Sequence, residues 1–123
     1  MAGTRTEKIQ DILRQLRGSS PDITGAAVLT SDGFVVASLL PSELDEELIS
    51  GMAATLLGVG ERIAREMLGS EHEQVYVRAK DGYVIINSVT DQEVLIVLTT
   101  RKVKLGLVFM EIRQRTPELE RLL

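Results

Sequence analysis

The residues best able to do chemistry are few in this 123-residue chain. Its single histidine, His72, lies in a polar turn between Glu71 and Glu73, and the chain has no cysteine. A metal site needs several converging donors, and a lone histidine with acidic neighbours is more often an ordinary surface residue. The lack of cysteine excludes disulfides, thiolate catalysis and zinc fingers. We therefore expect no metal site.

A second candidate is the segment Gly58-Val59-Gly60, which has the composition of a phosphate-binding loop. Such a loop joins a strand to the start of a helix, whereas this segment lies inside a long helical pattern. The chain has neither a nucleophile elbow nor a zinc-protease motif. We therefore expect no catalytic residue and no cofactor, and we interpret the protein as a non-enzyme.

The composition favours one soluble domain over residues 1–123, because domains commonly have about 100–150 residues. A net charge of −4 and a content of two Tyr, two Phe and no Trp argue against nucleic-acid binding. No run reaches the roughly 18 apolar residues that span a bilayer, and the N-terminus lacks the apolar core of a signal peptide. We expect a cytoplasmic protein that does not insert into membranes.

The hydrophobic pattern predicts the order helix, two strands, helix, three strands, helix. An amphipathic helix over Thr6–Arg17 precedes the strands Ile23–Thr30 and Phe34–Leu40, which meet at an Asp-Gly turn. Asp81-Gly82 predicts a second hairpin turn. Pro117 is expected to kink or end the last helix, which leaves Glu118–Leu123 as a further turn or a fraying tail. The other elements are expected at Glu43–Leu68, Glu73–Lys80, Tyr83–Val89, Val94–Thr99 and Lys102–Arg115.

The longest periodic segment, Glu43–Leu68, predicts a helix with Ser42 as its N-cap and a broad apolar face. Glycines inside it are unusual, because each costs about 1 kcal/mol relative to alanine in a helix interior. Two of them belong to a bare stripe where a second helix could approach closely; the alternative is that they only fit under the chain's own sheet. The stripe consists of Gly51, Thr55, Gly58 and Arg62.

The segment Glu73–Lys80 predicts an edge strand, because apolar and polar residues alternate along it. An unpaired edge is a template for pairing with another chain. The edge and the glycine stripe are thus two places where another chain could make contact, and the family resemblance described below joins them into one dimer interface. Its residues are Gly51, Thr55, Gly58, Arg62, Val75, Tyr76, Val77 and Arg78.

Together these patterns resemble the Roadblock family, also called the dynein light chain Roadblock type, and especially its stand-alone bacterial members. The resemblance rests on the hairpin Ala27–Ala37, the long helix with Ala53-Ala54 and later glycines, the three-strand meander, and Lys104–Val108 at the start of the last helix. It covers about Thr6 to Arg115.

The resemblance implies an α+β fold, an α/β sandwich with a five-stranded antiparallel sheet in the order 2-1-5-4-3. The long helix would cover one face and the terminal helices the other. The resemblance also implies a homodimer in which the third strands join and the long helices pair antiparallel. The bacterial members are similar to a gliding-motility regulator that binds a small Ras-like GTPase and accelerates its hydrolysis, so a GTPase is the implied partner.

Three hypotheses follow. The first is a homodimeric regulatory or adaptor protein that binds a small Ras-like GTPase; if it stimulates GTP hydrolysis, it does so by repositioning the GTPase's own residues. The second is a scaffold without effect on nucleotide turnover, and the third is a small-molecule sensor of the profilin-like or PAS-like type. Under the first, the outer strip of the long helix is predicted to meet the partner, and its residues are Glu47, Ser50, Ala54, Glu61 and Arg65.

Overall fold

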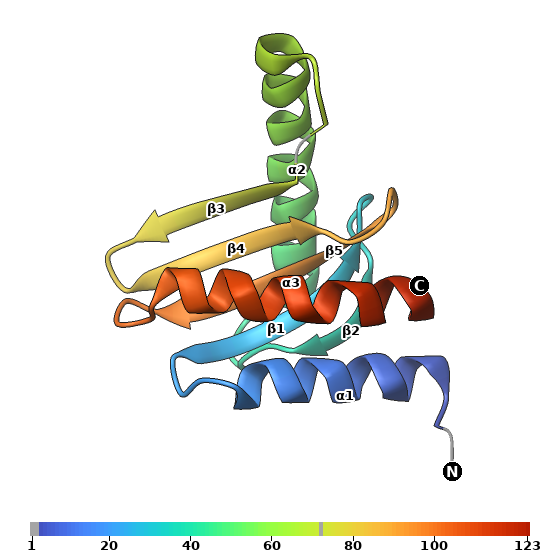
Figure 1. Ribbon diagram of the computed structural model, residues 1–123, viewed down its shortest axis with the longest axis vertical. Helices are drawn as coiled ribbons and strands as arrows, with labels where there is room; N and C mark the ends of the chain where they lie inside the picture. Colours follow the sequence, from blue (N-terminus) through green and yellow to red (C-terminus); the bar gives the residue numbers. More distant parts are fainter. Residues whose placement is uncertain (1–2, 72) are drawn as a thin grey trace.

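The computed structural model describes residues 3–71 and 73–123, and its elements follow the predicted order. Helix α1 (Arg5–Gly18) precedes strands β1 (Ile23–Thr30) and β2 (Val35–Leu39) and the long helix α2 (Glu46–Leu68). Strands β3 (Gln74–Ala79), β4 (Gly82–Ser88) and β5 (Glu93–Thr100) come next, followed by α3 (Leu105–Leu122) (Figure 1).

The five strands form one antiparallel sheet in the order β2-β1-β5-β4-β3. The central strand β5 pairs with β1 on one side and with β4 on the other. Helices α1 and α3 lie side by side on one face, and α2 runs across the other (Figure 1). The structure therefore confirms the predicted α+β fold and strand order.

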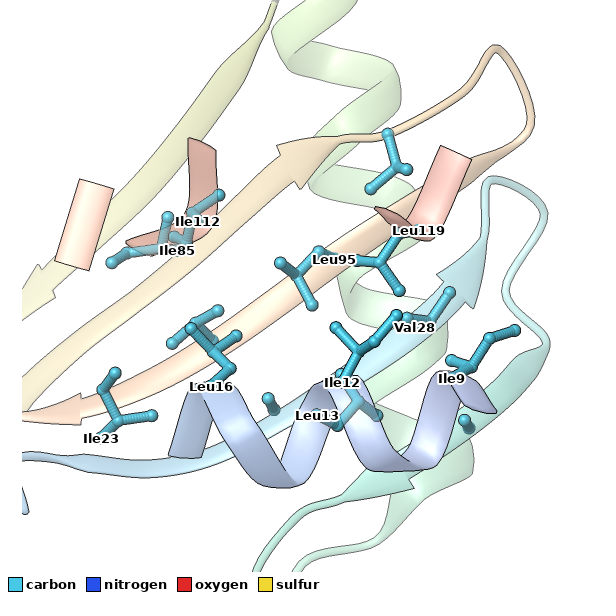
Figure 2. Close-up of a cluster of buried hydrophobic side chains, with 14 of the residues drawn as sticks. Ile9, Ile12, Leu13, Leu16, Ile23, Val28, Ile85, Leu95, Ile112 and Leu119 are labelled. Carbon is cyan, nitrogen blue, oxygen red and sulfur yellow. The ribbon is translucent and has the colours of Figure 1, made fainter. Parts of the chain in front are cut away.

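The core between the sheet and the helices α1 and α3 is extensive and closed. Ile9, Leu13 and Leu16 of α1 are 0% exposed, as is Leu119 of α3. Figure 2 shows these side chains pointing toward the sheet, where they meet Val28 and other strand residues. Burying one large aliphatic side chain contributes about 1.5–3 kcal/mol, so this face supplies most of the stabilisation of the fold.

The core under α2 is smaller. Ala53 and Leu57 of α2 pack on Leu29 of β1, Ile86 of β4 and Ile96 of β5. Besides these two, Ser50 is the third buried residue of α2. Helix α2 therefore covers its face of the sheet incompletely.

Among the described helices, none combines the length and the apolar character needed to cross a membrane.

The start of α2 differs from the prediction. Asp45, and not Ser42, is the N-cap, and its carboxylate accepts a hydrogen bond of 3.2 Å from the Leu48 N–H. Both residue types are good N-caps, so composition alone could not choose between them. The predicted helix end was correct, since Gly69 caps α2 in the left-handed conformation with a φ of 65°.

The end of α3 was also predicted wrongly, because the helix continues through Pro117 to Leu122. A proline removes one backbone hydrogen bond and weakens a helix locally. In the turn before it, the Thr116 hydroxyl donates to the Ile112 carbonyl at 2.7 Å. Beyond it, Leu119 is completely buried. Tertiary packing of the last turns therefore outweighs the preference of proline for a helix end.

The two Asp-Gly turns differ. Gly33 has a φ of 97°, as a turn glycine should, whereas Gly82 is the first residue of β4 and has no positive φ. A Cβ on Gly82 would lie 2.0 Å from the carbonyl oxygen of Thr99 on β5. The expectation that Gly82 is a turn residue is therefore wrong: glycine is needed there because two backbones approach closely.

We predict that Gly82→Ala lowers the free energy of unfolding by about 2 kcal/mol, because the backbone of β5 must move away from the added methyl group. The measurement is urea denaturation at one fixed protein concentration. Gly106→Ala is the matched control, because a Cβ there meets no atom of the described residues within 4 Å. Equal loss of stability in both variants would contradict this account.

Candidate interaction surface

Helix α2 is longer than the sheet is wide. Its 23 residues span about 34 Å at 1.5 Å per residue, whereas five strands about 4.8 Å apart measure about 19 Å across. The C-terminal part of α2 consequently extends past the edge strand β3 (Figure 1). Within 61–68 no side chain is buried, and Met67 and Leu68 are 77% and 79% exposed.

One side of α2 carries an exposed apolar row. Leu48, Met52, Val59 and Ile63 are each more than half exposed, although their spacing is typical of a helix face that packs against a core. The sequence pattern predicted a broad apolar face but not that most of it is uncovered. Exposed apolar surface of this kind marks sites of contact with other proteins.

An apolar groove of about 430 Å³ lies between this row and the sheet. Met52 and Leu56 line its helical side, and Val77 of β3, Val84 of β4 and Leu98 of β5 line the sheet side. All of its lining residues are apolar. The groove is therefore a place where a further helix can lie on the sheet beside α2.

The glycine stripe lies on the side of α2 that is roughly opposite Ala53. A Cβ built on Gly51 or Gly58 meets no heavy atom of the described chain within 4 Å. The alternative that these glycines fit under the chain's own sheet is therefore wrong. Their contact with a second helix stays a prediction. All four residues of the stripe are exposed: Gly51, Thr55, Gly58 and Arg62.

Strand β3 is a sheet edge, as predicted, and in the described chain it pairs on one side only, with β4. Its side chains alternate between the two faces. Val77 lies opposite Val84, which packs in the core under α2, and Tyr76 faces α3, with its ring centroid 5.9 Å from that of Phe109. The residues predicted for the interface therefore divide between faces: Val75 and Val77 on the α2 side, Tyr76 and Arg78 on the α3 side.

The five residues predicted to meet a partner differ in exposure. Ser50 is 1% exposed, and its hydroxyl donates to the Glu46 carbonyl at 2.7 Å. The expectation that Ser50 belongs to an exposed strip is wrong, because the β1–β2 hairpin covers it: a Cβ on Gly33 would lie 3.6 Å from the Ser50 carbonyl oxygen. Of the remaining four, Glu47, Glu61 and Arg65 are exposed and Ala54 is half-buried.

Two hairpin tips lie beside this strip (Figure 1). The Ser31 N–H donates to the Gln92 carbonyl at 2.8 Å and so joins the β1–β2 tip to the β4–β5 loop. A groove of about 410 Å³ between these tips and α2 is lined in part by the acids Glu61, Glu71 and Asp91. The strip is therefore one wall of a larger polar surface.

Phe34, at the β1–β2 tip, is 68% exposed. The sequence pattern places Phe34 in the second predicted strand and indicates no role for it in partner binding. The Asp-Gly signal marks the turn but does not show whether the aromatic residue after it points into a core. In the structure Phe34 precedes β2, and its N–H donates to the Thr30 hydroxyl at 2.9 Å.

Two other sequence candidates add nothing to this surface. Gly58-Val59-Gly60 lies within α2 and not at a helix start, so it forms no phosphate loop. His72 lies outside the described residues. In the parts of the chain that the structure describes, no group of three or more His, Asp or Glu side chains could hold a metal ion.

Comparison with known proteins gives consistent matches. A family model described as the Roadblock/LC7 domain matches residues 9–99. An uncharacterized protein of Methanocaldococcus jannaschii is 33% identical over 98 residues, which cover 80% of this chain and 85% of that protein. The Roadblock/LC7 domain of Streptomyces avermitilis has a TM-score of 0.85 at 18% identity, over 91% of this chain and 94% of its own. MglB of Myxococcus xanthus has a TM-score of 0.89 at 17% identity, over 99% and 92%.

We predict that Arg65→Ala changes the free energy of unfolding by less than about 0.5 kcal/mol, because exposed ion pairs contribute little. The Arg65 guanidinium lies 3.9 Å from the Glu61 carboxylate, and both side chains are at least half exposed. Ser50→Leu, on the same helix, should destabilise by about 1–3 kcal/mol through overpacking. Thermal and urea unfolding check both values, and a similar loss in the two variants would refute the assignment of Arg65 to the surface.

Proposed function

The chain belongs to the Roadblock/LC7 family, and from this premise we propose that it is a homodimeric adaptor that binds a small Ras-like GTPase. The observation that carries the proposal is that α2 extends past the sheet edge with its apolar row uncovered. A second copy supplies what this arrangement lacks: a sheet beneath the extension and a helix along the row.

The proposed dimer joins the two β3 edges into one sheet. Continuing the sheet beyond β3 places the partner's strands under the C-terminal part of α2. Ile63 and Met67, which are 51% and 77% exposed, then reach the partner's apolar groove, whose sheet side includes Val77 and Val84. The two copies of α2 run antiparallel and bury the row Leu48, Met52, Val59 and Ile63 between them. The glycine stripe adjoins this row and forms the margin of the contact, where its glycines let the two helices approach closely.

Such an interface involves a strand edge, a groove and a helix face from each copy. Specific and stable interfaces bury at least about 1,000 Å² in total, with an apolar centre and a polar rim. The apolar row and groove supply the centre. Arg62, exposed at the margin of the row, supplies part of the rim.

The GTPase is proposed to bind on the outer strip of α2 and the adjacent hairpin tips. This surface combines charged side chains on α2 with the exposed ring of Phe34. Exposed aromatic and arginine side chains are the residues that most often dominate binding energy at interfaces. In the proposed dimer, the two joined sheets and the paired α2 helices carry two copies of this surface.

Two levels of activity fit this arrangement. As an adaptor, the protein holds the GTPase without changing nucleotide turnover. As a regulator, it accelerates hydrolysis by fixing the position of the GTPase's own residues, since ordering groups around the phosphate is the main route of catalysis in this class. The measurement that separates the two is GTP turnover by the GTPase with and without the protein.

We predict that Ile63→Glu raises the dissociation constant of the homodimer by at least about 100-fold, because a carboxylate would be buried without a partner. Leu107→Glu is the matched control: Leu107 is 54% exposed on α3, on the opposite face of the sheet, and undergoes the same chemical change. Sedimentation equilibrium measures both variants. The dimer model fails if the unmodified protein sediments as a monomer or if the two variants weaken it equally.

We predict that Arg65→Ala weakens binding of a small Ras-like GTPase from the same organism by about 10-fold or more, since a hydrogen bond to a charged group contributes about 1.5–3 kcal/mol. Calorimetric titration gives the affinity, and phosphate release gives the turnover. Arg113→Ala, at an exposed position on α3, is the control and should bind normally. No binding by the unmodified dimer would disprove the GTPase assignment, whereas binding with unchanged turnover would identify a scaffold.

A further inference from the structure

We infer that β3 pairs with a second copy of itself in one register, with Tyr76 on the two-fold axis. This inference rests on the proposed homodimer and specifies its central contact. It follows from three features of the strand: which backbone groups point outward, which side chains then meet on the α2 side, and which meet on the α3 side.

The outward backbone groups of β3 follow from its pairing with β4. The Ser88 N–H donates to the Glu73 carbonyl at 3.0 Å, and Gln74 lies opposite Asn87. In an antiparallel pair, residues alternate between bonding the neighbour and pointing away from it. Glu73, Val75 and Val77 therefore bond toward β4. The residues whose N–H and C=O groups point to the free edge are Gln74, Tyr76 and Arg78.

A two-fold pairing centred on Tyr76 uses every one of these outward groups. Tyr76 then exchanges both hydrogen bonds with its own copy, and Gln74 exchanges both with the partner's Arg78. Shifting the centre to Val75 or to Val77 leaves an outward residue of each β3 strand without a strand partner. Unpaired backbone groups in a buried interface are costly, so the centred register is favoured.

The side chains on the α2 side agree with this register. Centring on Tyr76 places Val75 opposite the partner's Val77, a β-branched pair at the closer, non-hydrogen-bonded spacing. Centring on Val75 would instead oppose Val77 with a carboxylate, that of Glu73. Centring on Val77 would bring Glu73 opposite Asp81, two like charges. In the centred register the carboxylate of Glu73 lies opposite the partner's Ala79, at the ends of the junction, so the two Val75–Val77 pairs extend the apolar groove across its middle.

On the α3 side the centred register brings two Tyr76 rings together. Tyr76 already lies against Phe109 and Tyr83, with ring centroids 5.9 and 6.2 Å away, yet it is 48% exposed. The partner's Tyr76 would cover this exposed part and join two aromatic clusters into one. The amide of Gln74 would face the guanidinium of Arg78, a neutral acceptor for a charged donor.

The test uses single cysteines, because the chain has none of its own. A Val75→Cys protein and a Val77→Cys protein carry tags of different length, so that mixed and self-linked products differ in size. The two proteins are mixed, unfolded in denaturant and refolded together so that their subunits exchange, and then oxidised with glutathione disulfide. In the centred register residues 75 and 77 of opposite copies have Cα atoms about 4.5 Å apart, within disulfide range, whereas 75 and 75 are about 8 Å apart. We expect the mixed disulfide to form at least about 10-fold faster than either self-disulfide.

Two further variants complete the experiment. Tyr76→Cys should cross-link with itself, since its two Cα atoms lie about 5.5 Å apart. Arg78→Cys, on the same face and edge, should not, because its copies lie about 14 Å apart. Faster self-linking of Val75→Cys or of Val77→Cys would overturn the register while leaving the dimer intact. A dimer that sediments normally but cross-links at none of these positions would overturn β3 pairing, and a monomeric unmodified protein would overturn the proposed homodimer itself.

Discussion

A mismatch of length governs this structure: α2 spans about 34 Å, and the sheet that it crosses is about 19 Å wide. A helix with a broad apolar face can bury that face only where a sheet or another helix lies against it. In one copy, the sheet meets only the first half of α2, where Ala53 and Leu57 are buried and Ile49 and Leu56 are partly buried. The remaining apolar side chains face solvent, and each would contribute about 1.5–3 kcal/mol if it were buried.

The two faces of the sheet therefore differ in function: one stabilises the fold, and the other is open to a partner. The face under α1 and α3 is closed by fully buried side chains such as Leu13, Leu16 and Leu119, so the fold has a complete core without help from another chain. The face under α2 keeps an apolar groove and an open edge beside it. Stability from one face leaves the other free for recognition, as the proposed adaptor role requires.

The sequence predicted the elements and their order because those depend on local periodicity and on glycine turns. Strand order came from the family resemblance, since neither hairpin shows which strands become neighbours across the sheet. Three of the errors have a common cause, which is that tertiary contacts overrode local preference. Buried Leu119 keeps α3 helical beyond Pro117, the β1–β2 hairpin covers Ser50, and the nearby backbone of Thr99 requires Gly82.

The candidate site was predicted less fully than the fold. Periodicity placed the edge character of β3 and the bare stripe on α2 correctly, because both are properties of one element. It could not show that Met52 and Ile63 would be uncovered, since exposure depends on where the sheet ends. Phe34 was missed for the same reason: the direction of one side chain at a hairpin tip depends on the whole assembly of strands.

The strand order has a consequence for how the chain acquires its structure. β5 is both the central strand and the last one in sequence, and it joins the β1–β2 hairpin to the β3–β4 hairpin. Until β5 pairs with β1 and β4, no backbone hydrogen bonds of the sheet connect the two hairpins. During synthesis the two hairpins are therefore separate units until β5 has left the ribosome. Contacts of such long sequence separation slow folding but couple distant parts of the chain. The domain should accordingly fold late in synthesis and in a single cooperative step, with no stable half.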